Sequence, residues 1–304
     1  MSADRPVVIL AGGTGGAKLA RGMLDVVGER LVVIANTGDD VEIYGAHVSP
    51  DPDLVTFWLA DRIDERGWGL RDDTFNVMDG MRELGIDVWF SLGDRDLAIG
   101  LERARQLDSG VRLTHAQAAL AAALGVRARV LPMSDVPVRT RVLVDGRWWP
   151  LQEFLILHQG DGEVLDVDFR GRRAAPPTAE VTEALASARA IVIGPSNPVI
   201  SIGPILSLEG VRDAIRSSPA PVVAVSPIVD KQIVKGPTAA FMRWRGNPLT
   251  SDGIVAEYDG LLDGLIADQP AGSLPVLETD VLMDSAGARR RLAEQTLHFA
   301  LGLA

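Results

Sequence analysis

The residues with the clearest chemical potential follow a short apolar run near the start of the chain. Residues 9–22 read ILAGGTGGAKLARG, where four glycines occur within five positions and a helix-like pattern with one lysine, Lys18, follows. Glycines between a strand and a helix leave backbone N–H groups to bind an anion at the positive end of the helix. The loop lacks the third glycine of a dinucleotide fingerprint, because Lys18 holds that position, and it lacks the Gly-Lys-Ser/Thr of a P-loop. It therefore predicts an anion site and leaves the nucleotide open.

Polar residues also follow five other apolar runs. In an open parallel α/β sheet, ligands bind beyond the carboxyl ends of the strands. We therefore expect all six loops to open on one edge of the sheet and to form one site. The five further loops are NTGDD (36–40), GDRD (93–96), PMSD (132–135), PSNPVISIGP (195–204) and SPIVDKQIVKGP (226–237).

The acidic residues of these loops also have structural explanations. The two acids of NTGDD can form an ordinary turn, although Asp39 would hold a ribose in a simple dinucleotide-binding protein. SPDPD (49–53) precedes an apolar run, so Ser49 or Asp51 can cap a helix there. The acids of GDRD can form local ion pairs with Arg95. These alternatives stay open.

Other polar residues are less specific. Ser196-Asn197 lies between prolines and can be a rigid turn or a group that binds a base edge or a ribose. His47, His115 and His158 show no triad or metal-site spacing, so we interpret them as structural. The chain has no cysteine, which excludes disulfides, thiolate zinc sites and cysteine nucleophiles.

Composition limits the partners. The 304 residues are 47% hydrophobic and 23% charged, which is typical of a globular protein, and the net charge is −11. That charge argues against nucleic acid or an anionic membrane as a partner. No apolar stretch reaches the roughly 18 residues of a membrane span, and no signal-peptide pattern begins the chain. We therefore expect a cytoplasmic protein.

The apolar runs predict the elements that position these loops. Residues 7–11, 31–35, 190–193 and 222–225 are short apolar runs typical of buried parallel strands, and residues 17–27 and 208–216 have helical spacing. This order predicts an α/β fold with a Rossmann-like, doubly wound, mostly parallel sheet. The residues WFSL (89–92) are taken as a further strand.

The middle of the chain has a different pattern. Residues 74–84 and 114–124 are predicted helices, the second capped by Thr114, and residues 138–170 alternate around Asp145-Gly146 as in a β-hairpin. We expect helical insertions and an antiparallel extension within about residues 50–170. The remaining core spans about residues 6–50 and 186–270. The stretch 172–180 is linker-like, but one α/β domain over residues 1–304 is predicted.

Together the motifs resemble one family closely. GGTGGAK, NTGDD, SPDPD, SLGDRD, LPMSD, PSNPVISIGPIL and VSPIV occur in the order and spacing of the 2-phospho-L-lactate transferase (CofD/FbiA) family, and RGWGLRDDTF (66–75) adds to the match. The resemblance runs from about residue 7 to the C-terminal helix. PSNPVISIGPIL is long and unusual, so the match is far more specific than a glycine loop alone.

The resemblance implies a transferase in the biosynthesis of the deazaflavin coenzyme F-420. The donor is a guanosine diphosphate ester that carries lactate or enolpyruvate on its terminal phosphate. The acceptor is the deazaflavin precursor Fo, whose ribityl hydroxyl attacks the phosphorus so that GMP leaves. The family also implies Mg²⁺ and a homodimer. No motif distinguishes lactate, enolpyruvate or glycerate as the transferred acid.

The resemblance also implies roles for individual residues. Asp40 and Asp53 are the catalytic and metal-binding candidates, and Asp53 is alternatively expected to orient the Fo hydroxyl. Ser91, which stands where other members often have lysine, and Asp94 are placed with Asp53 on the Fo side. Nucleotide and phosphate binding is implied for Gly12, Gly13, Thr14, Gly15, Lys18, Asn36, Ser196, Asn197 and Ser201.

Two other functions compete with this interpretation. A sister family of nucleotide-sugar-binding regulators of carbon metabolism, the gluconeogenesis-factor family, shares the glycine loop and the sheet. SPDPD and RGWGLRDDTF favour the transferase. An NAD-dependent dehydrogenase is disfavoured because Lys18 replaces a glycine of the fingerprint.

Overall fold

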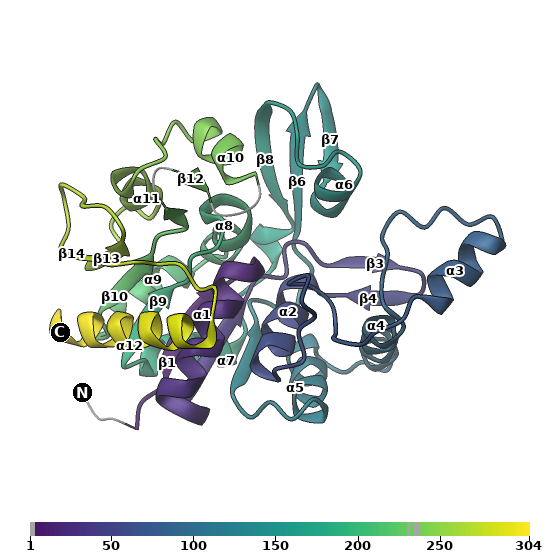
Figure 1. Cartoon of the computed structure of the whole chain (residues 1–304), viewed down its shortest axis with the longest axis horizontal. Helices are drawn as coiled ribbons and strands as arrows, with labels where there is room; N and C mark the ends of the chain where they lie inside the picture. The colour runs from purple at the N-terminus through teal and green to yellow at the C-terminus, as the bar shows by residue number, and fades with distance from the viewer. Residues whose placement is uncertain (1–3, 230–231, 234–236) are drawn as a thin grey trace.

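The protein is built around one seven-stranded sheet, as a computed structural model of the chain shows (Figure 1). The structure describes residues 4–229, 232–233 and 237–304. The strand order is β14-β13-β10-β9-β1-β2-β5 and every neighbouring pair is parallel. The predicted Rossmann-like sheet is therefore confirmed. Its strands are β1 (Val7–Ala11), β2 (Leu31–Ala35), β5 (Arg129–Pro132), β9 (Ala190–Ile193), β10 (Val222–Val225), β13 (Gly264–Ala267) and β14 (Val276–Glu278).

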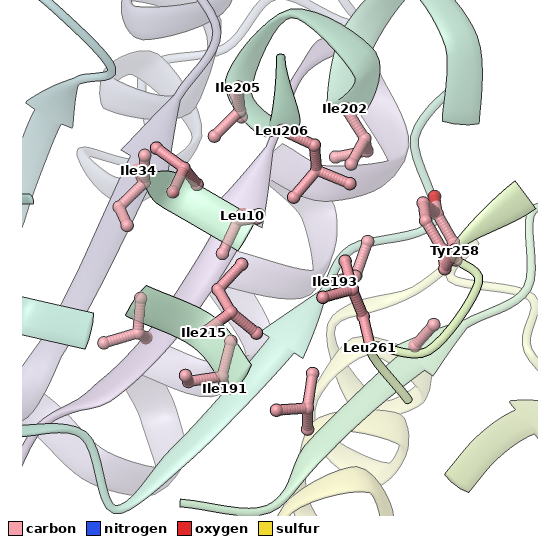
Figure 2. Packing of buried hydrophobic residues seen from close by; sticks show 14 of the residues in the cluster. Leu10, Ile34, Ile191, Ile193, Ile202, Ile205, Leu206, Ile215, Tyr258 and Leu261 are labelled. Carbon is pink, nitrogen blue, oxygen red and sulfur yellow. The ribbon is translucent and has the colours of Figure 1, made fainter. Parts of the chain in front are cut away.

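Alternation along the strands gives the sheet two buried faces. On β1, Val8 and Leu10 contribute to one hydrophobic cluster, whereas Val7, Ile9 and Ala11 contribute to another on the opposite face. Figure 2 shows the first cluster, in which strand residues pack against the segment that follows β9 and against the chain near Tyr258. Because both faces are buried, the strands are continuous apolar runs.

Helices cover these faces. On the face of Val7, helix α1 (Gly13–Val27) packs between α2 (Pro50–Leu59) and α12 (Ala286–Gly302). On the other face, a π-helical turn, η3, and α8 pack against the sheet. The helices and turns of the second face and its surroundings are α7 (Ala179–Ser187), η3 (Pro198–Ile202), α8 (Gly203–Leu206), α9 (Val211–Ser217), α10 (Thr238–Trp244) and α11 (Ser251–Glu257).

The middle of the chain forms two additions to this core. The first carries a short hairpin of β3 (Val41–Ile43) and β4 (Ala46–Val48), which was not predicted, and three helices. Those helices are α3 (Asn76–Glu83), α4 (Asp94–Asp108) and α5 (Leu113–Ala123). The second addition is the predicted antiparallel extension.

That extension is a three-stranded sheet. Its strands β6 (Arg139–Val144), β7 (Arg147–Pro150) and β8 (Val164–Arg170) have the order β7-β6-β8, and α6 (Leu151–Ile156) follows β7. The hairpin turn falls on Asp145 and Gly146, with φ values of 52° and 75°. Two consecutive residues with positive φ define a type I′ turn, so the turn residues predicted the hairpin correctly.

Two local predictions are wrong. WFSL (89–92) forms no strand, so the GDRD loop does not follow a strand of the sheet but begins α4. Thr114 is not the cap of its helix, because α5 begins at Leu113 with Arg112 at the N-cap. Asp135 accepts instead from the backbone N–H of Thr114 at 2.8 Å and from its hydroxyl at 2.7 Å.

Two predicted helices have different boundaries in the structure, and one predicted loop is described only in part. The first predicted helix begins at Gly13 rather than residue 17, so the glycines after Gly12 belong to the helix. The helix predicted over 208–216 spans Val211–Ser217. Part of the predicted loop 226–237 lies outside the described residues. Within the described part of the chain, no helix is both long and apolar enough to cross a membrane.

Candidate functional site

The glycine loop joins β1 to α1 at the carboxyl edge of the sheet. Gly13 has a φ of +64°, which a side chain rarely tolerates. A Cβ on Gly12 would lie 2.7 Å from a carboxylate oxygen of Asp51, and one on Gly15 would collide with the carbonyl oxygen of Pro195. These glycines therefore permit a close approach to two other loops as well as a turn.

The loop forms one wall of a cavity of about 400 Å³, here called the glycine-loop cavity. Lys18 lies on this wall with its Nζ 5.8 Å from the ring centroid of Trp58, and it is half-buried. The opposite walls come from the loops after β9 and β10 and from apolar residues such as Leu155. Its polar lining comprises Thr14, Lys18, Ser196, Asn197, Ser201, Ser226 and Thr238, together with the backbone of Gly12, Gly13 and Gly15.

The two predicted base-binding residues hold the loop after β9. Ser196 is buried, and its hydroxyl accepts from the backbone N–H of Gly12 at 3.2 Å. Asn197 accepts from the N–H groups of Val199 and Ile200 at 2.9 and 3.1 Å, and it donates to the Thr238 hydroxyl at 3.1 Å. Asn197 thus caps η3 while also lining the cavity.

Four buried carboxylates, those of Asp39, Asp40, Asp51 and Asp53, meet beside the glycine loop. The structure therefore brings the acids of NTGDD and SPDPD together. Burial raises the pKa of Asp39 well above its usual value, and the charges of Asp51 and Asp40 add to the shift. Such a cluster of like charges is stable only with cations or donors around it.

Asp51 joins the cluster to the glycine loop. One of its oxygens accepts from the backbone N–H of Gly13, and the other accepts from the Asn36 amide at 2.9 Å. Burial raises the pKa of Asp51 to about 6, against the opposing effect of these two donors. Asn36 also accepts from the Gly38 N–H at 2.7 Å. It was expected to bind the nucleotide or its phosphates, and the structure places it outside the lining of the glycine-loop cavity, where it supports the carboxylates.

Asp51 is therefore not the simple helix cap that the sequence allowed. Ser49 holds the N-cap position of α2, and its side chain makes no capping bond.

Asp40 pairs with a histidine. Its Oδ2 lies 3.1 Å from His47 Nε2, and His47 Nδ1 lies 3.4 Å from Glu42. Although burial opposes it, hydrogen bonding to Asp40 and Glu42 raises the pKa of His47 to about 9. Asp40 Oδ1 is buried and has no hydrogen-bond partner among the described residues. Asp40 also borders two adjoining cavities of about 490 and 560 Å³, together with Glu42 and Arg139.

Asp53 pairs with a buried arginine. Both of its oxygens accept from the Arg103 guanidinium, whose Nη1 lies 3.0 Å from Asp53 Oδ2. Arg103 is fully buried and also donates to the His47 carbonyl at 2.9 Å and to Gln117 at 3.2 Å. Burial raises the pKa of Asp53 although Arg103 opposes the shift. Arg103 therefore fixes one carboxylate of the cluster in place.

Residues of SPDPD line part of a second cavity, of about 390 Å³. It is called the aromatic cavity because four aromatic side chains line it. The rings of Trp89 and Phe90 are stacked at 5.5 Å, and Trp68 is 44% exposed. The lining comprises Phe57, Trp68, Trp89, Phe90, the apolar residues Val48, Pro50, Leu54, Leu92 and Ile156, and Gly69, Ser91, Asp51, Asp53 and Asp96.

Two elements connect the two cavities. Asp51 lines the aromatic cavity and bonds the glycine loop. Helix α6 places Leu155 in the glycine-loop cavity and Ile156 in the aromatic cavity. Ligands in the two cavities would therefore meet near Asp51.

The predicted Fo-side residues have different positions. Ser91 lines the aromatic cavity. Asp94 lies outside its lining and holds the start of α3, because its carboxylate accepts from the Thr74 hydroxyl at 2.6 Å and from the Val77 N–H at 3.0 Å. Among the residues described, neither acid of GDRD forms an ion pair with Arg95, so the structure does not support that alternative.

The sequence predictions missed three groups of this site. Arg103 was not predicted, although it continues the i, i+3 row of buried positions formed by Leu97 and Gly100 on α4, where a charged residue needs a partner. The pairing of His47 with Asp40 and the place of Trp68 in the wall of the aromatic cavity were also missed. The Arg103 pair and the aromatic wall depend on contacts between distant segments, whereas Asp40 and His47 meet through the β3–β4 hairpin, which was not predicted.

Comparison with known proteins shows to which family the chain belongs. A family model described as 2-phospho-L-lactate transferase CofD matches residues 7–290. The chain is 37% identical to the 2-phospho-L-lactate transferase of Methanocaldococcus jannaschii, over 96% of this chain and 97% of that protein. It is 38% identical to the phosphoenolpyruvate transferase of Kitasatospora aureofaciens, over 96% and 99% of the two chains.

A solved structure supports the fold. A member of the UPF0052 family from Bacillus halodurans superposes with a TM-score of 0.65 over 98% of this chain and 99% of that one, at 17% identity. At that identity the likeness concerns the fold alone. The family model and the curated relative from Methanocaldococcus jannaschii name the same kind of protein. The chain therefore belongs to the 2-phospho-L-lactate transferase CofD family.

Proposed function

We propose that the chain transfers a phospho-organic-acid group, 2-phospholactate or phosphoenolpyruvate, from a guanosine diphosphate ester to the deazaflavin precursor Fo, releasing GMP. The family makes the chain a transferase of the 2-phospho-L-lactate or phosphoenolpyruvate type in coenzyme F-420 biosynthesis. One observation supports the two-substrate arrangement most directly: Asp51, which lines the aromatic cavity, accepts from the backbone N–H of Gly13, which lines the glycine-loop cavity.

The glycine-loop cavity suits the donor. It lies at the N-terminus of α1, a helix of 15 residues, where backbone N–H groups and the helix dipole favour phosphate. Lys18 adds a positive charge on the cavity wall. In a chain of net charge −11, such local groups are needed to hold a diphosphate.

The aromatic cavity suits the acceptor. A deazaflavin ring is flat and aromatic, and stacked aromatic side chains are the usual partners of such rings. Trp68, Trp89 and Phe90 provide them. A ring bound there would present its ribityl chain toward Asp51 and the glycine loop.

The carboxylate cluster suits Mg²⁺. Magnesium prefers one or two carboxylates together with substrate phosphates, so a complete protein cage is not required. Within the described residues no group of three or more His, Asp or Glu side chains has the arrangement of a metal site. Asp40 fits best because its buried Oδ1 lacks a partner, and Asp53 would contribute as the carboxylate fixed by Arg103. The bound ion would neutralise charge on the donor phosphates.

The residues present match the chemistry. An in-line phosphoryl transfer requires positioning and charge neutralisation rather than a covalent nucleophile. Lys18 and the first turn of α1 bind the diphosphate in this proposal, and the aromatic walls hold Fo. The attacking hydroxyl forms a P–O bond while the bond to GMP breaks.

The regulator alternative is not favoured, because both the family model and the curated relatives are transferases. We also propose that the protein forms a homodimer and is cytoplasmic, as expected for this family. Light scattering of the purified protein tests the dimer.

Separate binding measurements test the two cavities. Lys18→Ala should weaken GDP binding and leave Fo binding unchanged, whereas Trp68→Ala should weaken Fo binding roughly tenfold and leave GDP binding unchanged. Trp148→Ala is the control, because Trp148 lines neither cavity. Calorimetry with GDP, a UDP-sugar and NAD should show binding of GDP alone. Preference for a UDP-sugar, or equal effects of both variants on both ligands, would contradict the assignment.

A further inference from the structure

We propose that Asp96 accepts the proton of the attacking acceptor hydroxyl, a role that rests on the proposed transferase function. Asp96 lies in the first turn of α4 and lines the aromatic cavity together with Asp51 and Asp53. From the sequence, Asp96 was only a possible ion-pair partner of Arg95. Its surroundings give it a different role.

The other two acids on the cavity wall are already engaged. Asp51 accepts from Gly13 with one oxygen and from Asn36 with the other. Asp53 accepts from Arg103 with both oxygens. A carboxylate that holds a fixed donor on each oxygen is poorly placed to take a proton from a substrate.

Asp96 differs from both. Its backbone N–H donates to Asp73 at 3.1 Å, which fixes the start of the helix, but no described residue donates to its carboxylate. The side chain is partly buried beside the aromatic walls, so water solvates it incompletely. An unsatisfied carboxylate facing a cavity has its hydrogen-bonding capacity left for a ligand.

The charges around Asp96 favour a proton acceptor. Asp53 and Asp73 are the negative groups that act on it, and Arg103 is the positive one. Burial, followed by the charges of Asp53 and Asp73, raises the pKa of Asp96 to about 7, and Arg103 opposes this shift. A general base with a pKa near the working pH is both largely deprotonated and basic enough to accept a proton.

The step balances without a further reactant. The acceptor O–H bond breaks and its proton passes to the Asp96 carboxylate. The hydroxyl oxygen forms the new P–O bond, and the bond from phosphorus to the GMP oxygen breaks with its electron pair on GMP. Asp96 then loses the proton to solvent.

The test compares Asp96→Asn with the wild type under saturating Mg²⁺ and donor. We expect kcat to fall roughly 100- to 10,000-fold, the usual contribution of general-base catalysis, while the Fo dissociation constant changes by less than about threefold. The wild-type kcat/KM should rise with pH through a pKa near 7, and that rise should be absent in the variant. Glu102→Gln, an exposed carboxylate change on the same helix, is the control.

Three results would overturn the role of Asp96. They are a kcat within threefold of the wild type, an unchanged rise with pH in the variant, and a loss of activity that higher Mg²⁺ concentrations reverse. If the wild type itself transfers nothing from either donor, the proposed function fails instead. Binding of Fo by fluorescence is measured in both proteins, so loss of binding is distinguished from loss of chemistry.

Discussion

Removal of Arg103 should destabilise the protein strongly and in a pH-dependent manner. Its guanidinium is fully buried and donates to Asp53, to the His47 carbonyl and to Gln117. Arg103→Met would leave the Asp53 carboxylate buried without its cation. Breaking a buried ion pair by removing one partner typically costs about 3–5 kcal/mol. At roughly 2 °C per kcal/mol for a chain of this size, Tm should fall by about 6–10 °C.

The loss should depend on pH because Asp53 can escape the penalty by taking up a proton. Without Arg103 the pKa of Asp53, already raised by burial, should rise further. A carboxyl group whose pKa is raised in the folded state stabilises that state at low pH, and this contribution disappears as pH rises through the folded pKa. The gap between Arg103→Met and wild type should therefore be larger at pH 8 than at pH 5.

Urea unfolding at both pH values measures this gap. The double variant Arg103→Met/Asp53→Asn is the matched control, because it also removes the Asp53 charge that the single variant leaves buried without a cation. It should recover much of the lost stability at pH 8. A single variant as stable as wild type at pH 8, or a double variant no better than the single one, would refute the reasoning.

Three further predictions concern other parts of the site. Lys18→Ala should weaken GDP binding roughly ten- to a hundredfold, since a charge-assisted hydrogen bond contributes about 1.5–3 kcal/mol. An unchanged GDP affinity by calorimetry would show that Lys18 does not bind the diphosphate. Asn197→Ala should lower the free energy of unfolding by about 1 kcal/mol, because two N–H groups at η3 lose their acceptor; no change in urea unfolding would contradict the cap. Asp96→Asn should make the metal-free protein more stable than wild type at pH 8, because burial raises the pKa of Asp96 to about 7 and its charged form is disfavoured. That advantage should shrink as pH falls toward the pKa of an unfolded aspartate, and thermal unfolding across this range that shows no such trend would contradict the burial argument.

Local patterns predicted the parts of the fold that local sequence controls. The apolar run of β1 and the Asp145-Gly146 turn each depend on nearby residues, and each was placed correctly. The strand predicted at WFSL was wrong because a short run with three apolar residues fits a strand and an irregular wall of a cavity equally well. Burial of such a run does not require a sheet.

The site was predicted less completely because its side chains are organised by contacts across the fold. The sequence placed Lys18 and the SPDPD acids near one edge, and the structure puts Lys18 in the glycine-loop cavity and the acids in the aromatic cavity. It did not predict that Arg103, 50 residues after Asp53, would supply the buried cation for it. Nor did it predict that Asn197 would use its amide to cap η3. Partner choice among polar side chains is a property of three-dimensional packing.

Product formation tests the central claim most directly. The purified chain should be incubated with Fo, Mg²⁺ and, in separate reactions, the lactate, enolpyruvate and glycerate esters of guanosine diphosphate. Mass spectrometry should then detect Fo carrying the phospho-acid group and an equal amount of GMP from at least one donor. EDTA should abolish the product and Mg²⁺ should restore it, and Asp40→Asn should lower kcat by roughly a hundredfold or more. Full activity in EDTA would remove the metal from the account, and the absence of product from every donor would contradict the transferase function itself.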